Sequence, residues 1–246
     1  MKTTEKPQMK YLKDYKKPDF KIENVDLIFD LDEENTQVTS TLEIVSDYDR
    51  SAGVRPLILD GNHLTFKYIK MDGKDLAADQ YEVADKGLTV FNPPERFTLE
   101  IGTEIHPKAN TRLEGLYYSN GALCTQNEPE GFRCITYYLD HPDVMSSFTT
   151  TLIADKKKYP ILLSNGNPIE KKELPDGKHQ VTWHDPFKKP CYLFAIVGGD
   201  LASLHDTFTT KSGREVKLGI YVEHGYENQA SFALESLKRA MKWDED

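Results

Sequence analysis

The sequence contains little cysteine. Its 246 residues include three, at positions Cys124, Cys134 and Cys191, and their spacing matches no disulfide framework. An odd number of unpatterned cysteines is typical of reduced thiols, so we expect a cytoplasmic protein. A disulfide between Cys124 and Cys134 is the alternative.

Long hydrophobic runs are also missing. The longest apolar run, Tyr192 to Val197, is far shorter than the roughly 20 apolar residues that a membrane-spanning helix needs. The segment from Met1 to Pro7 is polar and lacks the apolar core of a secretory signal. We therefore expect no membrane association, and an extended, charged lead-in over residues 1–18.

Positive charge is scarce relative to negative charge. The chain has 31 Lys and Arg against 40 Asp and Glu, a formal net charge of −9. Because phosphate binding requires a basic face, nucleic acid is not an expected partner. An acidic surface is compatible with cationic ligands such as peptide amino termini, although in most proteins it simply maintains solubility.

Common catalytic motifs are absent as well. There is no His-Glu-x-x-His, and no two of the seven histidines have the i, i+4 spacing that places two imidazoles on one helix face. Neither a Gly-x-Ser-x-Gly elbow nor a glycine-rich phosphate loop occurs. The sequence therefore predicts no catalytic residue and no metal site within this chain.

What the chain does have is short alternating segments. Val25, Leu27 and Phe29 recur at period two, and the pattern returns from Val38 to Ile44 after a turn at Asp32 to Asn35. Further short strands follow at residues 56–59, 63–71, 81–83, 88–91 and 97–105. This pattern predicts a mainly β fold, an antiparallel curved sheet or β-sandwich, and not a parallel α/β fold.

The residue pattern changes at Gly198-Gly199-Asp200, where an apolar run expected to be buried ends in flexible residues. We place a domain boundary there, with one β domain over residues 1–200 and a second segment over residues 201–246. In the second segment, residues 206–210 and 215–222 predict a β-hairpin. Residues 228–242 predict an amphipathic helix with a stripe of Ala230, Ala233, Leu234, Leu237 and Met241. The stripe is expected to pack on the preceding hairpin or on a domain that this chain lacks.

The segment from Cys124 to Asp143 contains the candidate site. Side chains alternate in an extended chain, so Gln126 and Glu128 face the same way and Asn127 faces the opposite way. Pro129 and the glycine that follows mark the end of the strand. A carboxylate in this position can pair with an ammonium group, at roughly 4 kcal/mol for contact at an effective dielectric near 20.

Two alternatives remain for these residues. An isolated glutamate in a turn is most often a solvated surface residue. Arg133 is expected to be structural, and the alternative is that it orients Glu128, in competition with a substrate amine. Downstream, Pro142 fits the first turn of a short helix.

The run Thr125-Gln-Asn-Glu-Pro-Glu-Gly-Phe-Arg-Cys-Ile-Thr-Tyr-Tyr-Leu-Asp-His-Pro-Asp-Val144 resembles the substrate-amine motif of the zinc-dependent aminopeptidase N family, peptidase family M1. Similar blocks follow in the family's order at residues 162–167, 185–195, 206–216 and 241–245. Upstream, Lys10-Tyr11 and the block from Glu114 to Tyr117 also match. The resemblance therefore extends over nearly the whole chain.

The resemblance implies a role for each site residue. The residue matching Glu128 grips the α-ammonium group of a peptide with a free N-terminus, and the one matching Gln126 lines the pocket for the first side chain. A Gly-x-Met-Glu-Asn loop supplies a second carboxylate, while Zn2+ is held by His-Glu-x-x-His and a further Glu. None of these motifs occurs in this chain.

The chain is thus expected to be the N-terminal β domain of an M1 metalloaminopeptidase, followed by the hairpin and helix that begin its catalytic domain. Zinc would be bound only in the complete enzyme, and the partners would be peptide substrates and the missing catalytic and C-terminal domains. This fragment alone is expected to be inactive. The alternative is a non-catalytic β-sandwich interaction module, or a degenerate M1 relative.

Overall fold

Alternating apolar residues form the first two strands. In the computed structural model, which describes Met9 and residues 11–246, Val25, Leu27 and Phe29 are buried in β1 (Phe20–Asp30). In β2 (Thr36–Ser46), Val38, Ser40, Leu42 and Ile44 are buried on one face. The strands pair antiparallel across residues 31–35, so the hairpin predicted from the period-two pattern is confirmed.

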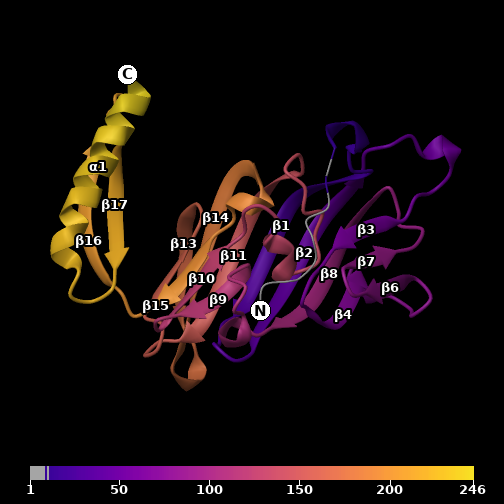
Figure 1. Ribbon diagram of the computed structural model, residues 1–246, viewed down its shortest axis with the longest axis horizontal. Helices are drawn as coiled ribbons and strands as arrows, with labels where there is room; N and C mark the ends of the chain where they lie inside the picture. Colours follow the sequence, from indigo (N-terminus) through magenta and orange to yellow (C-terminus); the bar gives the residue numbers. More distant parts are fainter. Residues whose placement is uncertain (1–8, 10) are drawn as a thin grey trace. The chain divides into compact units, whose positions relative to one another are not determined.

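These strands belong to an eight-stranded sheet with the order β13-β14-β11-β1-β2-β8-β4-β5 (Figure 1). The other members are β4 (Thr65–Met71), β5 (Lys74–Asp75), β8 (Arg96–Ile105), β11 (Met145–Asp155), β13 (Asn167–Glu173) and β14 (Lys178–Pro190). The pairs are antiparallel except for β1 and β11, which run parallel. A parallel pair needs a long crossover, here the whole segment between residues 30 and 145.

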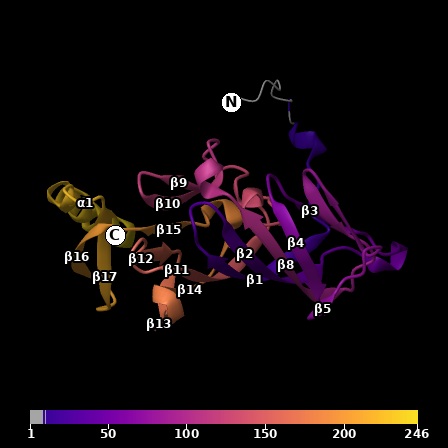
Figure 2. The ribbon, with the colours of Figure 1, turned by 90° about the horizontal axis from the view of Figure 1, so that it is seen from below.

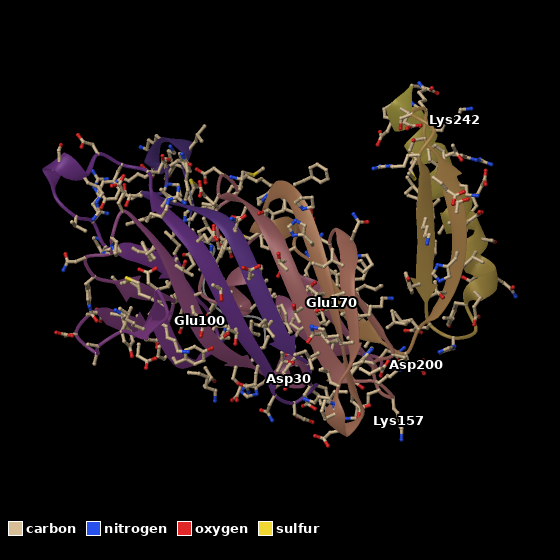
Figure 3. The ribbon with its side chains drawn as sticks, turned by 180° about the vertical axis from the view of Figure 1, so that it is seen from behind. Asp30, Glu100, Lys157, Glu170, Asp200 and Lys242 are labelled. Atoms are coloured by element: carbon tan, nitrogen blue, oxygen red, sulfur yellow. The ribbon has the colours of Figure 1, made fainter. Side chains whose placement is uncertain are left out.

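One face of this sheet is polar. Figure 3 shows Asp30, Glu100 and Glu170 on that face, on strands β1, β8 and β13. Glu100 pairs with Lys70 of the neighbouring strand at 3.1 Å. The opposite face is apolar, since Phe97, Leu99 and Ile101 of β8 are all buried. One-sided burial is the arrangement expected for a mainly antiparallel sheet.

Two smaller sheets complete the first unit. One has the order β3-β7-β6, with β3 (Leu57–Asp60), β6 (Tyr81–Ala84) and β7 (Gly87–Val90). The other has the order β12-β15-β10-β9, with β9 (Gly115–Ser119), β10 (Ala122–Gln126), β12 (Ile161–Ser164) and β15 (Ile196–Gly199). Figure 2 shows β9 and β10 on one side of β1 and β2. A mainly β fold of several antiparallel sheets agrees with the sequence prediction.

An aromatic cluster lies in the core directly after β10. The Phe132 ring is fully buried and meets Tyr138 edge to face at a centroid distance of 4.8 Å, and Phe194 in the same way at 5.3 Å. Phe148 of β11 completes the cluster at 6.2 Å from Phe132. Such edge-to-face pairs add stabilisation beyond the buried area. The segment that carries the candidate site is therefore part of the core.

Several local predictions are wrong or only partly tested. Pro142 does not begin a helix; it lies in a turn in which the Val144 amide donates to the His141 carbonyl at 3.1 Å. All three cysteines are free thiols, so the alternative disulfide does not form. Part of the expected lead-in over residues 1–18 lies outside the described residues, and the described part contains a 3-10 turn at Leu12–Asp14.

The chain divides into two compact units, Met1–Gly198 and Gly199–Asp246. In the second unit, β16 (Ala202–Thr209) and β17 (Glu215–Val222) form the expected hairpin, followed by α1 (Glu227–Glu245). Ala230 and Leu234 of α1 are buried, and the helix contacts both strands, so the apolar stripe packs on the preceding hairpin. Ala233, expected in the stripe, is exposed, as is Phe232 at 79%.

None of the helices in the described part of the chain combines the length and apolar content that a membrane span requires.

We expect Phe132→Ala to lower the free energy of unfolding of the first unit by about 3–5 kcal/mol, because it removes the ring at the centre of the aromatic cluster. Denaturant unfolding followed by circular dichroism measures this loss. Phe187→Ala is the matched control, since that ring is 78% exposed and its removal should cost less than about 0.5 kcal/mol. Equal losses in the two variants would contradict the assignment of Phe132 to the core.

Candidate functional site

A tight turn follows β10 and carries the candidate site. The strand ends at Gln126, two residues earlier than the extended run expected from the sequence. The Gly131 amide then donates to the Asn127 carbonyl at 2.9 Å and closes the turn. The peptide bond between Glu128 and Pro129 is cis. Glu128 therefore lies at the tip of a turn and not on a strand.

The expected alternation of side chains is nevertheless present. Asn127 is buried, and its Nδ2 donates to the Phe194 carbonyl at 2.6 Å, while Gln126 and Glu128 are exposed. The Gln126 side chain donates through Nε2 to the main-chain carbonyl of Glu128 at 3.3 Å. The structure thus brings the two predicted site residues together, with Gln126 contacting the backbone of the turn and not the Glu128 carboxylate.

The turn separates two cavities. The larger has a volume of about 550 Å³ and is lined by Asp60, Glu128, Pro129, Glu130, Arg133, Asp140, His141, Pro142 and Tyr192. The smaller, of about 340 Å³, shares Glu128 to Glu130 and Arg133 and adds Gly61, Asn62, Lys86, Glu114 and Gly131. Glu128 lines both cavities, whereas Gln126 lines neither.

Arg133 is the centre of the charged network in the larger cavity. Its Nε donates to Asp140 Oδ2 at 2.9 Å, and its Nη1 lies 3.5 Å from Asp60 and 3.8 Å from Glu130. Burial alone would lower the pKa of Arg133, but the hydrogen bond with Asp140 and the neighbouring carboxylates raise it overall. The guanidinium is therefore a fixed positive charge. It pairs with these three carboxylates and does not contact Glu128, so the alternative that it orients Glu128 directly is not realised.

Asp140 connects this network to the core. Its side chain is 2% exposed, and besides Arg133 it accepts a hydrogen bond from Cys191 Sγ at 3.0 Å. Burial, followed by the charge of Asp140, raises the pKa of the Cys191 thiol, so the sulfur keeps its proton and donates. Tyr192, the next residue, lines the cavity. The buried carboxylate thus has a partner for each oxygen.

Glu128 differs from the other carboxylates of this cavity. Its side chain makes no hydrogen bond or ion pair with any residue that the structure describes. Four carboxylates line the cavity against one guanidinium, so the local charge is negative. A cleft lined by one sign of charge attracts ligands of the other sign. The charge of the cavity and the Glu128 carboxylate, unpaired among the described residues, are therefore compatible with a small cationic ligand.

Sequence reasoning missed Asp60, Glu130 and Asp140 as members of the site. Glu130 and Asp140 lie in the segment already singled out, and their acidic character next to Arg133 could have indicated an ion-pair network. Asp60 gave no such signal, because it lies at the end of β3, 73 residues before Arg133. The main-chain bridge between Asp60 and Tyr138 brings the two segments together.

The described residues contain no group of three or more His, Cys, Asp or Glu side chains arranged to hold a metal ion. The carboxylates of the cavity are instead arranged around a guanidinium. The residues present here therefore do not fit a zinc site, and we derive no chemical step through zinc from them.

Comparison with known proteins identifies the family of the chain. Residues 17–193 match the Peptidase M1 N-terminal domain. The chain is 53% identical over 243 residues to aminopeptidase N of Escherichia coli, covering 99% of this chain and 27% of that protein. It superimposes on a crystal structure of Legionella pneumophila aminopeptidase A in complex with aspartic acid with a TM-score of 0.90, at 40% identity over 96% of this chain and 28% of the other.

An M1 zinc metallopeptidase of Deinococcus radiodurans shares the fold, with a TM-score of 0.69 at 16% identity over 84% of this chain and 48% of that one. The chain spans about a quarter of the length of the aminopeptidase N relative. The match to the domain and the high identity along the whole chain establish the family, and this chain belongs to peptidase family M1, of which it contains the N-terminal domain.

Proposed function

We propose that this chain is the N-terminal portion of a zinc-dependent aminopeptidase, and that Glu128 binds the α-ammonium group of a peptide substrate. The observation that carries the proposal is the free Glu128 carboxylate at the rim of a 550 Å³ cavity whose other acidic groups surround Arg133. The names of the relatives, aminopeptidase N and M1 zinc metallopeptidase, support the same activity.

The physical basis is a charge-assisted hydrogen bond. A protonated amine has three N–H donors and no acceptor, and a carboxylate that has no other partner has all its lone pairs available. Fixing the amine also fixes the distance from the N-terminus to the first peptide bond, so one anchor determines which bond is presented for cleavage. In the proposed complete enzyme, such an anchor would limit cleavage to the first peptide bond.

The other parts of the proposal concern groups near or outside this chain. The Gln126 side chain donates to the main-chain carbonyl of Glu128 and so stabilises the turn. As the resemblance implies, it would also border the pocket for the first side chain of the substrate. Zinc and its ligands would be supplied by the catalytic domain, of which residues 201–246 are the proposed beginning. The three free thiols are consistent with a cytoplasmic protein.

In the complete protein, Glu128→Gln should lower kcat/KM for an unblocked aminoacyl substrate by about 30- to 150-fold, mainly through a higher KM. The loss of one charge-assisted hydrogen bond, worth about 2–3 kcal/mol, sets this magnitude. Steady-state kinetics on alanyl and leucyl chromogenic substrates measure the change. The conservative replacement keeps the shape of the side chain, removes its charge and replaces one acceptor oxygen by an NH2 donor.

Glu82→Gln is the control for this variant, because Glu82 is an exposed glutamate on β6 and lines neither cavity. A second readout is inhibition by leucinamide compared with its analogue that lacks the amine. Wild-type protein should prefer leucinamide, and Glu128→Gln should lose most of that preference. Kinetics of Glu128→Gln that match those of Glu82→Gln would refute the anchor, whereas a complete wild-type protein that hydrolyses none of these substrates would favour a non-catalytic interaction module.

Gly131→Ala tests whether the closed turn places the anchor. A Cβ at Gly131 would lie 2.8 Å from the Asn127 Cα and would also collide with the Gln126 carbonyl oxygen, so the turn that carries Glu128 has to shift. We expect a rise in KM of about tenfold or more, since a displacement of the anchor near 1 Å can cost about 100-fold in rate. Gly73→Ala is the control, because a Cβ added at Gly73 would have no atom within 4 Å.

The Gly73 position has a φ of +76°, so its alanine variant carries backbone strain without a contact at the site. Thermal unfolding of both variants separates a general loss of stability from a displacement of the turn that carries Glu128. A KM for Gly131→Ala equal to that of Gly73→Ala would show that the turn does not need to be closed for substrate binding.

A further inference from the structure

The larger cavity contains more negative charge than one amine anchor requires. Asp60, Glu130 and Asp140 line it together with Glu128, and each could attract an ammonium group. An amine held by one of the other three would present the wrong bond. The cavity therefore needs a means of directing the amine to a single carboxylate.

Arg133 provides this selection through its contacts. Its Nε lies 2.9 Å from Asp140, and a second nitrogen donates to the Asp140 main-chain carbonyl at 3.1 Å. Its Nη1 lies 3.5 Å from Asp60 and 3.8 Å from Glu130. With 20% of its side chain exposed, the guanidinium lies among these carboxylates, where a competing ammonium would otherwise bind.

The position of Arg133 is fixed from several sides. Its main-chain amide donates to Asp140 Oδ2 at 3.2 Å, and its carbonyl accepts from the Asn62 amide at 2.9 Å. The second oxygen of Asp140 is occupied by Cys191, and Asp60 accepts from the Asp140 amide at 3.2 Å. Because these partners are themselves fixed by hydrogen bonds, the guanidinium has one arrangement. Among the described residues, it makes no hydrogen bond or ion pair with the Glu128 side chain.

We propose that Arg133 is a positioning residue that pairs with Asp60, Glu130 and Asp140, so that Glu128, which has no such partner among the described residues, is the carboxylate at which a substrate amine binds. This inference rests on the proposed function. In this role Arg133 determines which carboxylate holds the substrate amine, and it does not itself contact the substrate. Loss of the guanidinium should therefore open a non-productive binding mode in which the amine sits at Asp60.

Non-productive binding has a specific kinetic signature. A substrate held in the wrong place lowers kcat and KM by the same factor and leaves kcat/KM unchanged, because the extra complexes stabilise only the ground state. In the complete protein, Arg133→Gln should lower kcat and KM each by about tenfold, the change expected when a released carboxylate forms one competing ion pair. A merely structural role would instead raise KM or reduce the fraction of active protein.

Three further variants make the test decisive. Arg133→Lys keeps a positive charge at the same place and should recover most of kcat. Because Arg133→Gln leaves the buried Asp140 without its guanidinium partner, the double variant Arg133→Gln with Asp140→Asn removes that uncompensated charge and still releases Asp60. Glu128→Gln, measured in parallel, should lower kcat/KM and so differ in kind from the Arg133 variants.

The outcomes separate this inference from the proposed function. Parallel falls in kcat and KM for Arg133→Gln or for the double variant, with recovery in Arg133→Lys, support the positioning role. If KM rises, or kcat/KM falls as far as in Glu128→Gln, Arg133 does not select the binding register and the inference is overturned. If instead Glu128→Gln leaves kcat/KM unchanged, the anchor itself fails and the proposed function falls with it.

Discussion

The ion pair between Arg133 and Asp140 is the interaction on which the site depends. It joins the two ends of the segment that runs from the 3-10 turn at Phe132–Cys134 to the turn at Pro142. Asp140 is almost fully buried, so separating the pair would leave an uncompensated charge in the interior, at a cost of about 3–5 kcal/mol. The pair therefore holds its segment in a single arrangement.

That segment connects the core to the surface. On its inner side, Phe132 and Tyr138 pack in the aromatic cluster with Phe148 of the large sheet. On its outer side, the preceding turn presents Glu128 to the cavity. Because close-packed interiors transmit small displacements, the position of the turn is set by the core beneath it. The scaffold thus supplies the precision that a binding site on a loop would otherwise lack.

The carboxylates of the cavity differ in whether they are paired with Arg133. Three carboxylates share one guanidinium, and a fourth has no partner among the described residues. A uniformly acidic cavity would attract cations without ordering them. Under the proposal, local neutralisation by Arg133 leaves one preferred contact for a cation, and electrostatic complementarity then fixes the register of the ligand in addition to its affinity.

The sequence by itself determined many of the strands, the hairpin of β1 and β2, the exposure of Gln126 and Glu128 on either side of buried Asn127, and the family. These depend on period-two alternation and on ordered motifs, both of which are local. It failed where distant segments meet. The parallel pairing of β1 with β11, the turn where a helix was expected at Pro142, and the approach of Asp60 to Arg133 come from tertiary structure. Residues far apart in the chain carry no local sign of their contact, so only the folded chain could show which carboxylate Arg133 leaves free.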